Sequence, residues 1–281
     1  MKKTNHFYRF CALALSCLLL ISLLPVTQVL ADGDGAIHIK SAEDLRSLAH
    51  SCTLDSWSRG KTVVLDNDIE LTDDDELPIP TFGGTFNGNG HTISGLSITQ
   101  SVSPAGLFGV LQKDAVIKNL NVEGTVTPSG DSENIGGIVG ENHGTIESCT
   151  FNGSVSGKRS VGGIAGRNTA IGTVNYGYFN SEQEQRSGNT VIAEPKAVGE
   201  NVTMLGNTGV VKETAGMTAA ELKSEAFRDL LNDNQCEDKE LRTALAQGIS
   251  DFDIVVREAK LTIDSWVLDG IVRQGNAPAL A

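Results

Sequence analysis

Carboxylate side chains are most concentrated in the stretch "LDNDIELTDDDELP", residues 65–78. A calcium ion takes six to eight oxygen ligands, and a stretch this acidic could supply several of them. The calcium-loop pattern D-x-[DN]-x-[DN]-G does not occur, and we favour a solvated acidic connection. No other cofactor is indicated. The candidate calcium ligands are Asp66, Asp68, Asp73, Asp74 and Asp75.

Histidine and asparagine recur where glycine marks a turn. "NGNGH" ends in His91, and "ENHGTI" contains His143. Both segments fit tight turns, because Asn and Gly tolerate left-handed backbone angles, so neither histidine is expected to be catalytic. Asn142 and Asn168 each follow a G-x-x-G phrase by two positions. We expect them to stack at solenoid corners and to hydrogen-bond the backbone and one another.

A carbohydrate-active enzyme would need a specific set of groups. These are paired carboxylates across a groove, or Ca²⁺ with a basic residue that removes a proton beside a uronate carboxylate. Charged residues do not recur in register within the repeats, and aromatic residues that could stack on sugar rings are scarce. No local pattern marks a serine or cysteine nucleophile. We therefore expect no catalytic residue, and a polysaccharide lyase or glycoside hydrolase is the alternative.

The elements that must position these residues are visible as a repeat. Four segments share one apolar pattern at offsets of 24, 29 and 28 residues: "HTISGLSI" (91–98), "AVIKNLNV" (115–122), "GTIESCTF" (144–151) and "GTVNYGYF" (172–179). The first apolar column comprises Ile93, Ile117, Ile146 and Val174. The second comprises Leu96, Leu120 and Cys149, and the third Ile98, Val122, Phe151 and Phe179.

A glycine pair precedes three of these segments, in "GLFG", "GIVG" and "GIAG". The paired glycines are Gly106 and Gly109, Gly137 and Gly140, and Gly163 and Gly166. Glycine adopts backbone angles that other residues avoid and lets neighbouring chains approach closely. Each phrase therefore predicts a short strand between two tight corners.

The repeats predict a solenoid, because one unit of under 30 residues cannot bury its apolar face, whereas stacked units can. A helical solenoid would need amphipathic runs of ten or more residues, and none occurs from Thr81 to Phe179. We predict a mostly β fold, a right-handed parallel β-helix with short capping helices near both ends. A β-sandwich is the alternative.

Both flanks of the repeats carry helix-start signals. Ser41 and Asp44, and later Thr218 and Glu221, have the spacing of a capping box. The predicted organisation is a signal peptide over 1–31, an N-terminal cap of strand, helix and strand over 32–80, repeats over 81–200, and irregular coils with a helical cap over 201–281.

The N-terminus is typical of an export signal, with a positive start, an apolar run over residues 11–26 and a cleavage site after Ala31. That run is shorter than the roughly 20 residues of a membrane span, and no span is expected once it is removed. The remainder has 19 Lys+Arg and 35 Asp+Glu, a net charge of −16. Such acidity argues against nucleic acid or anionic lipid as a partner. We expect a secreted or cell-surface protein.

Three cysteines follow the predicted signal peptide: Cys52, Cys149 and Cys236. No C-x-x-C pair suggests a metal site, and an odd number allows at most one disulfide. Cys149 occupies an apolar column and is expected to be a small buried hydrophobic residue. A Cys52–Cys236 bridge is an open alternative for the other two.

The segments "GTFNGNGHTISGLSI", "GLFG", "IGGIVGEN" and "VGGIAGRN" resemble the repeats of GLUG-motif proteins. These are exported bacterial surface proteins, and the repeats also occur in IgA-cleaving metalloproteases. The resemblance covers most of residues 37–232 and implies a β-helical surface module, often without established catalysis. The metalloprotease motif H-E-x-x-H is absent, so no zinc protease is implied. We expect a non-catalytic module for adhesion or ligand binding, whose partner is a host or matrix glycan or protein.

Overall fold

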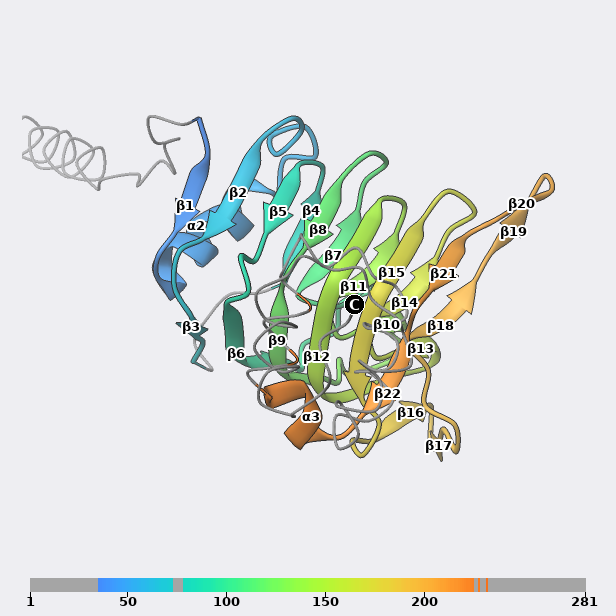
Figure 1. Ribbon diagram of the computed structural model, residues 1–281. Helices are drawn as coiled ribbons and strands as arrows, with labels where there is room; N and C mark the ends of the chain where they lie inside the picture. The colour runs from blue at the N-terminus through green and yellow to red at the C-terminus, as the bar shows by residue number, and fades with distance from the viewer. Residues whose placement is uncertain (1–34, 73–77, 225–226, 228–230, 232–281) are drawn as a thin grey trace, which may run out of the picture. The chain divides into compact units, whose positions relative to one another are not determined.

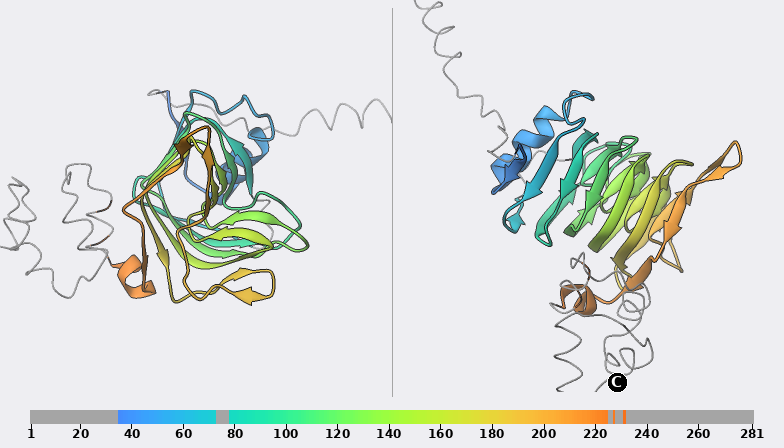
Figure 2. Two further views of the ribbon diagram at one scale, coloured as in Figure 1. Left: turned by 90° about the vertical axis from the view of Figure 1, so that its right-hand side faces the viewer. Right: turned by 45° about the horizontal axis from the view of Figure 1, so that its top comes forward.

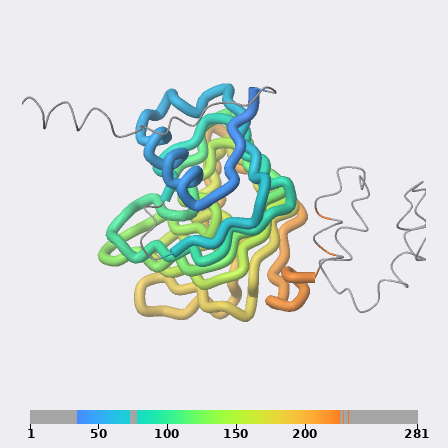
Figure 3. Tube along the Cα trace, turned by 90° about the vertical axis from the view of Figure 1, so that its left-hand side faces the viewer, coloured from blue at the N-terminus to red at the C-terminus, as the bar shows by residue number. Residues whose placement is uncertain are grey.

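The chain winds into a parallel β-helix, in which each short strand pairs with its equivalent in the next coil (Figure 1). The computed structural model describes residues 35–72, 78–224, 227 and 231. Viewed from the N-terminal end, successive coils lie behind one another along a common axis (Figure 3). The predicted signal peptide over residues 1–31 lies outside the described residues.

Most strands belong to one 13-stranded sheet. Its main path is β1 (Ile37–Ile39), β2 (Thr62–Leu65), β5 (Thr85–Asn87), β8 (Val116–Lys118), β12 (Thr145–Gly157), β9 (Asn121–Val126), β6 (Thr92–Ile98) and β3 (Ile69–Glu70). Joined to it are β15 (Thr173–Asn180), β16 (Gln185–Ser187), β17 (Thr190–Val191), β21 (Val210–Lys212) and β22 (Ala215–Met217).

Three smaller sheets complete the coils. The five-stranded sheet runs β18 (Val198–Asn201), β14 (Ala165–Asn168), β11 (Val139–Asn142), β7 (Phe108–Leu111) and β4 (Ile79–Phe82). A two-stranded sheet pairs β10 (Glu133–Gly136) with β13 (Arg159–Gly162), and a hairpin pairs β19 (Thr203–Met204) with β20 (Asn207–Thr208). Among the described strands, antiparallel pairing is confined to β16–β17 and β19–β20. The parallel β-helix is therefore confirmed over the β-sandwich, whose sheets are antiparallel.

The predicted columns hold from Ile117 onward. Ile117 pairs with Ile146 and Ile146 with Val174, all three fully buried. The placement of Ile93 in this column was wrong: Ile93 pairs with Val122, and Phe86 stands beside Ile117. The reason is an extra strand, β5, whose Phe86 takes the position assigned to Ile93. With this correction Ile93 and Val122 show the same 29-residue spacing as Ile117 and Ile146.

The paired glycines are sites of close approach between coils. None of the six has a positive φ. A Cβ at Gly137 would lie 2.2 Å from Cγ of Phe151 and 2.5 Å from the carbonyl oxygen of Gly163. A Cβ at Gly163 would lie 2.6 Å from Cβ of Phe179. Gly137 and Gly163 therefore make room for the aromatic residues of the third column, Phe151 and Phe179.

A buried asparagine ladder runs along one corner, as the sequence predicted. Asn142 Nδ2 donates to Asn168 Oδ1 at 2.8 Å, and Asn168 Nδ2 donates to Asn201 Oδ1 at 2.9 Å. Asn142 Oδ1 also accepts from the backbone N–H of Gly144 at 3.0 Å. Asn142 and Asn168 are fully buried, so these bonds satisfy polar groups that water cannot reach.

Helix α2 (Ala42–Ser51) contacts β1 and β4 at the N-terminal end of the stack. Ser41 caps it as predicted, since its Oγ accepts from the backbone N–H of Asp44 at 3.2 Å. Its buried face consists of Leu45, Leu48 and Ala49. No helix among the described residues is long and apolar enough to cross a membrane.

Helix α3 (Ala219–Lys223) starts at the predicted capping box of Thr218 and Glu221. It contacts β15 and β12, and Lys223 Nζ lies 3.0 Å from a carboxylate oxygen of Glu123. The Phe227 ring packs edge-on against Tyr178 with centroids 5.2 Å apart. In the view along the stack, α3 lies beside the coils (Figure 2, left). It covers the side of the stack rather than its end.

Cys149 and Cys52 are fully buried free thiols, and Cys236 lies outside the described residues. Burial raises the pKa of Cys149 to about 12 and that of Cys52 to about 11. Both thiols therefore stay protonated and enclosed in the folded protein, and only the thiolate is reactive.

We expect iodoacetamide at pH 8 to modify Cys149 and Cys52 in the denatured protein but not in the folded one. Peptide mass mapping after labelling with and without guanidinium would measure this at each cysteine. Rapid modification of Cys149 in the folded protein would contradict its place in the buried column.

Candidate functional site

A row of side chains follows the solvent face of the five-stranded sheet. Parallel pairing places Thr81, Val110, Glu141, Arg167 and Glu200 in register on successive strands. On the first four strands the residue that follows is fully buried, because side chains alternate between the two faces of a strand: Phe82, Leu111, Asn142 and Asn168. The row therefore lines up groups from five coils, uncharged at one end and charged at the other.

A cavity of about 750 Å³ lies at the uncharged end of this row, beside Thr81 and Val110. Its wall combines strand residues of the sheet, the corner after β7, the loop between α2 and β2, and the corner after β11. The lining residues are Asp55, Arg59, Pro80, Thr81, Val110, Gln112, Lys113, Asp114 and His143. Its volume is in the range of small-molecule sites.

Gln112 holds the cavity wall together. Its Nε2 donates to the backbone carbonyl of Asp55 at 2.8 Å and to Thr81 Oγ1 at 3.1 Å. Its Oε1 accepts from Nε of Arg59 at 2.9 Å. One amide side chain thus ties the loop after α2 to the five-stranded sheet and fixes the direction of Arg59.

The absence of a side chain at Gly83 leaves room for Arg59 and Gln112. A Cβ at Gly83 would lie 2.6 Å from Gln112 Oε1 and 2.9 Å from Cγ of Arg59. The backbone N–H of Gly83 donates to Ser58 Oγ at 2.8 Å, which anchors the same loop. The loop is therefore held in place on the sheet by several contacts, and the cavity wall is preorganised.

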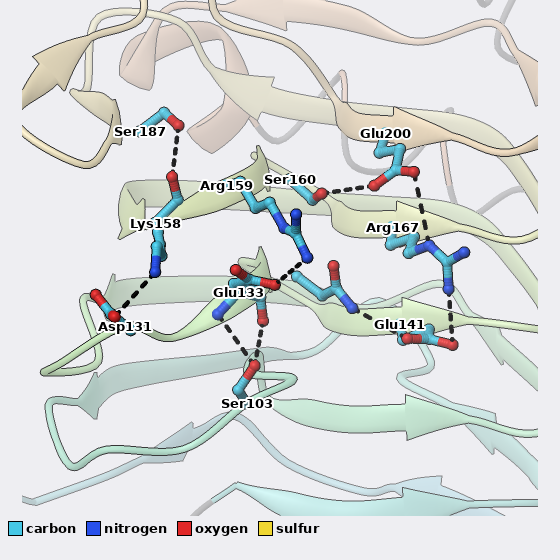
Figure 4. Close-up of polar contacts among 11 residues, drawn as sticks. Ser103, Asp131, Glu133, Glu141, Lys158, Arg159, Ser160, Arg167, Ser187 and Glu200 are labelled. Carbon is cyan, nitrogen blue, oxygen red and sulfur yellow. Dashed lines mark hydrogen bonds and ion pairs between the residues drawn. The ribbon is translucent and has the colours of Figure 1, made fainter.

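Glu141 joins the cavity to the charged end of the row. Its carboxylate accepts a hydrogen bond from Asn134 Nδ2 at 3.0 Å, and His143 Nε2 lies 2.9 Å from it. Arg167 Nη1 lies 3.4 Å from Glu141, and Arg167 Nε lies 3.8 Å from Glu200 (Figure 4). His143 lines the cavity, so this contact holds the Nε2 edge of its imidazole ring in place.

A second group of ion pairs lies along the two-stranded sheet (Figure 4). Lys158 Nζ is 2.9 Å from Asp131, and Arg159 is 2.7 Å from Glu133. The Asp131 carboxylate raises the pKa of Lys158. These pairs are exposed, and exposed pairs contribute little to stability. They connect neighbouring coils and do not line the cavity.

The candidate calcium ligands that the structure describes already have protein partners. Asp66 contacts His38 at 2.7 Å, and Asp68 contacts His91 at 3.1 Å and the backbone N–H of Thr92 at 2.8 Å. Asp73, Asp74 and Asp75 lie outside the described residues. In the described part of the chain, no group of three or more His, Cys, Asp or Glu is placed to hold a metal ion.

The sequence did not predict the cavity. His143 was interpreted as a corner residue, and it does lie at a corner, but it also lines the cavity. Arg59 and Gln112 are 53 positions apart and meet only through the fold of the loop after α2. Neither belongs to a repeated column, so the sequence carries no signal for them.

One coil of the β-helix matches a known protein family model. Residues 131–156 match the family model described as "The GLUG motif" (Glug). The chain contains a GLUG motif. The resemblance to GLUG-motif proteins is thereby confirmed. The motif spans β10, β11 and most of β12, and it includes Gly137, Gly140 and Asn142. The GLUG motif is therefore the unit of stacking, bearing a glycine pair and a member of the asparagine ladder.

Two relatives match part of the chain. The chain is 34% identical over 153 residues to Halomucin of Haloquadratum walsbyi, covering 50% of this chain and 2% of the relative. It is 29% identical over 129 residues to a "Putative Gly-rich membrane protein" of Evansella cellulosilytica, covering 34% of this chain and 15% of the relative. The chain thus spans only a small part of the length of these relatives.

A solved structure also aligns with the chain. It is the crystal structure of a "putative immunoglobulin A1 protease" from Bacteroides ovatus, with 14% identity and a TM-score of 0.28. The alignment covers 68% of this chain and 87% of that one. The assignment of the fold rests on the strand pairing and not on this alignment.

Proposed function

We propose that the chain is an exported β-helical module that works at the cell surface or in the medium and binds a ligand without chemically altering it. The GLUG motif, the β-helix, and relatives named as a halomucin and a Gly-rich membrane protein support a surface role. The partner is a glycan or protein of a host or surrounding matrix, and the module serves adhesion to it.

The cavity on the five-stranded sheet carries this proposal. Binding sites are concave and combine apolar surface with a few placed polar groups. Pro80 and Val110 supply apolar surface here, and Gln112 and Arg59 supply polar groups already held in position. A rigid stack that presents a preorganised cavity is suited to recognition, because little order must be gained on binding.

A glycan array and a panel of matrix proteins, probed with the purified protein, would test this function. Val110→Trp should fill the cavity and weaken binding at least tenfold. Val191→Trp is the matched control, because Val191 is exposed on β17 and does not line the cavity. Binding that survives Val110→Trp unchanged, or no binding to either panel, would contradict the proposal.

The alternative function is that of a carbohydrate-active enzyme. One observation favours it: His143, held by Glu141, lines the cavity and could act as a general base there. Every glycan that binds should therefore be examined for new reducing ends and unsaturated products. Cleavage that is lost in His143→Ala would replace the binding module with the enzyme.

A further inference from the structure

Arg59 differs from the other arginines that the structure describes. Arg46, Arg159, Arg167 and Arg186 each form an ion pair with a glutamate. Within the described residues, no carboxylate lies at ion-pair distance from Arg59. The chain has 35 acidic and 22 basic residues, so an arginine without a carboxylate partner is unexpected.

The guanidinium of Arg59 is nevertheless held in place. Its Nε–H donates to Gln112 Oε1 at 2.9 Å, and Gln112 is itself fixed by Asp55 and Thr81. This leaves the Nη1 and Nη2 groups available at the cavity. A planar guanidinium donates two parallel N–H bonds to a carboxylate, a geometry that a lysine ammonium does not offer.

The other charged residues of the cavity wall limit the class of ligand that fits. Lys113 adds a second positive charge, whereas Asp55 and Asp114 are acidic. Carboxylates repel a ligand that is anionic throughout, but they accept hydrogen bonds from hydroxyl groups. A ligand with one carboxylate among several hydroxyl groups therefore fits better than an acidic peptide or a highly sulfated chain.

Pro80 and Val110 supply an apolar surface on the same wall. A sugar ring presents C–H groups on its faces and hydroxyl groups at its rim, so it can use both parts of the wall. We propose that the cavity binds a uronic-acid glycan and that Arg59 binds its carboxylate. The inference rests on the proposed function, because it assigns the ligand class of the same cavity.

The test is calorimetric titration of the purified protein with oligosaccharides that carry one galacturonate, mannuronate or glucuronate residue among neutral sugars. Each is compared with its methyl-esterified form, which keeps the hydroxyl groups and removes the charge. The unmodified protein should bind at least one acidic oligomer about tenfold or more tightly than its ester. Arg59→Gln should reduce that preference to near one, because it removes the charge that distinguishes the acid from its ester.

Arg159→Gln is the matched control, because it removes the same charge from an arginine that lies outside the cavity. It should leave both affinities unchanged. Addition of salt should weaken binding of the acidic oligomer more than binding of its ester.

Different failures separate this inference from the proposed function. Suppose that Val110→Trp abolishes binding, so that the cavity is a ligand site. The inference is then wrong if acidic and esterified oligomers bind equally, or if Arg59→Gln keeps the preference for the acid. Arg59-dependent binding of poly-glutamate in place of the uronates would also overturn it. If no glycan and no matrix protein binds, both proposals fail.

Discussion

Replacing Gly137 with alanine is expected to lower the free energy of unfolding by about 3 kcal/mol or more. The new methyl group would meet the Phe151 ring at 2.2 Å and the Gly163 carbonyl oxygen at 2.5 Å. Neither neighbour can withdraw, because Phe151 is fully buried and Gly163 O accepts the backbone N–H of Gly137 itself. The midpoint of guanidinium denaturation, followed by circular dichroism, measures the loss.

Gly177→Ala is the matched control, since it makes the same change within a strand of the same stack. A Cβ at Gly177 would meet only side-chain atoms, at 3.1 Å from Val174 and 3.3 Å from Ile164. Gly177 pairs with Cys149, so the chain has room there for a small side chain. We expect a change within about 1 kcal/mol, because alanine recovers some of the stability that glycine forfeits in a strand. Equal losses in both variants would show that close approach at Gly137 is not the cause.

The periodic part of the fold was predictable from the sequence. Stacked coils repeat their requirements, so Ile117, Ile146 and Val174 recur with near-constant spacing, and the asparagines recur beside them. The error at Ile93 came from two similar apolar patterns in one coil. The 24-residue offset assigned there differed from the later offsets of 29 and 28 residues. The true equivalent, Phe86, is a different type of residue and did not match by pattern.

The cavity was not predictable, because only residues that every coil must provide recur in the sequence. Arg59 and Gln112 each occur once, in a loop and at a corner, and periodicity says nothing of single residues. Their meeting depends on Ser58 bonding the Gly83 backbone, a contact between parts of the chain with no shared pattern. Stacking constrains only the groups that every coil must provide, so residues that occur once lie outside the repeated pattern.

Asn168→Asp is expected to cost about 3 kcal/mol or more of unfolding free energy at pH 7. Asn168 is fully buried; its Oδ1 accepts from Asn142 at 2.8 Å, and its Nδ2 donates to Asn201 Oδ1 at 2.9 Å. Aspartate keeps the shape and the first bond. It replaces the donor with a second oxygen, which would face Asn201 Oδ1 and bury a charge.

This loss should depend on pH in a defined direction. Burial and the facing oxygen raise the pKa of the introduced carboxyl in the folded state above its unfolded value of about 4. The folded variant then holds its proton more readily than the unfolded one. Its stability relative to the parent protein therefore falls as pH rises from the unfolded pKa of about 4 to the higher folded pKa. Denaturation midpoints of both proteins at pH 7 and pH 4.5 should show a smaller deficit at the lower pH. Asn207→Asp on the exposed β20 should show almost no deficit at either pH. A deficit for Asn168→Asp that is the same at both values would mean that lost packing, and not the charge within the ladder, is the cause.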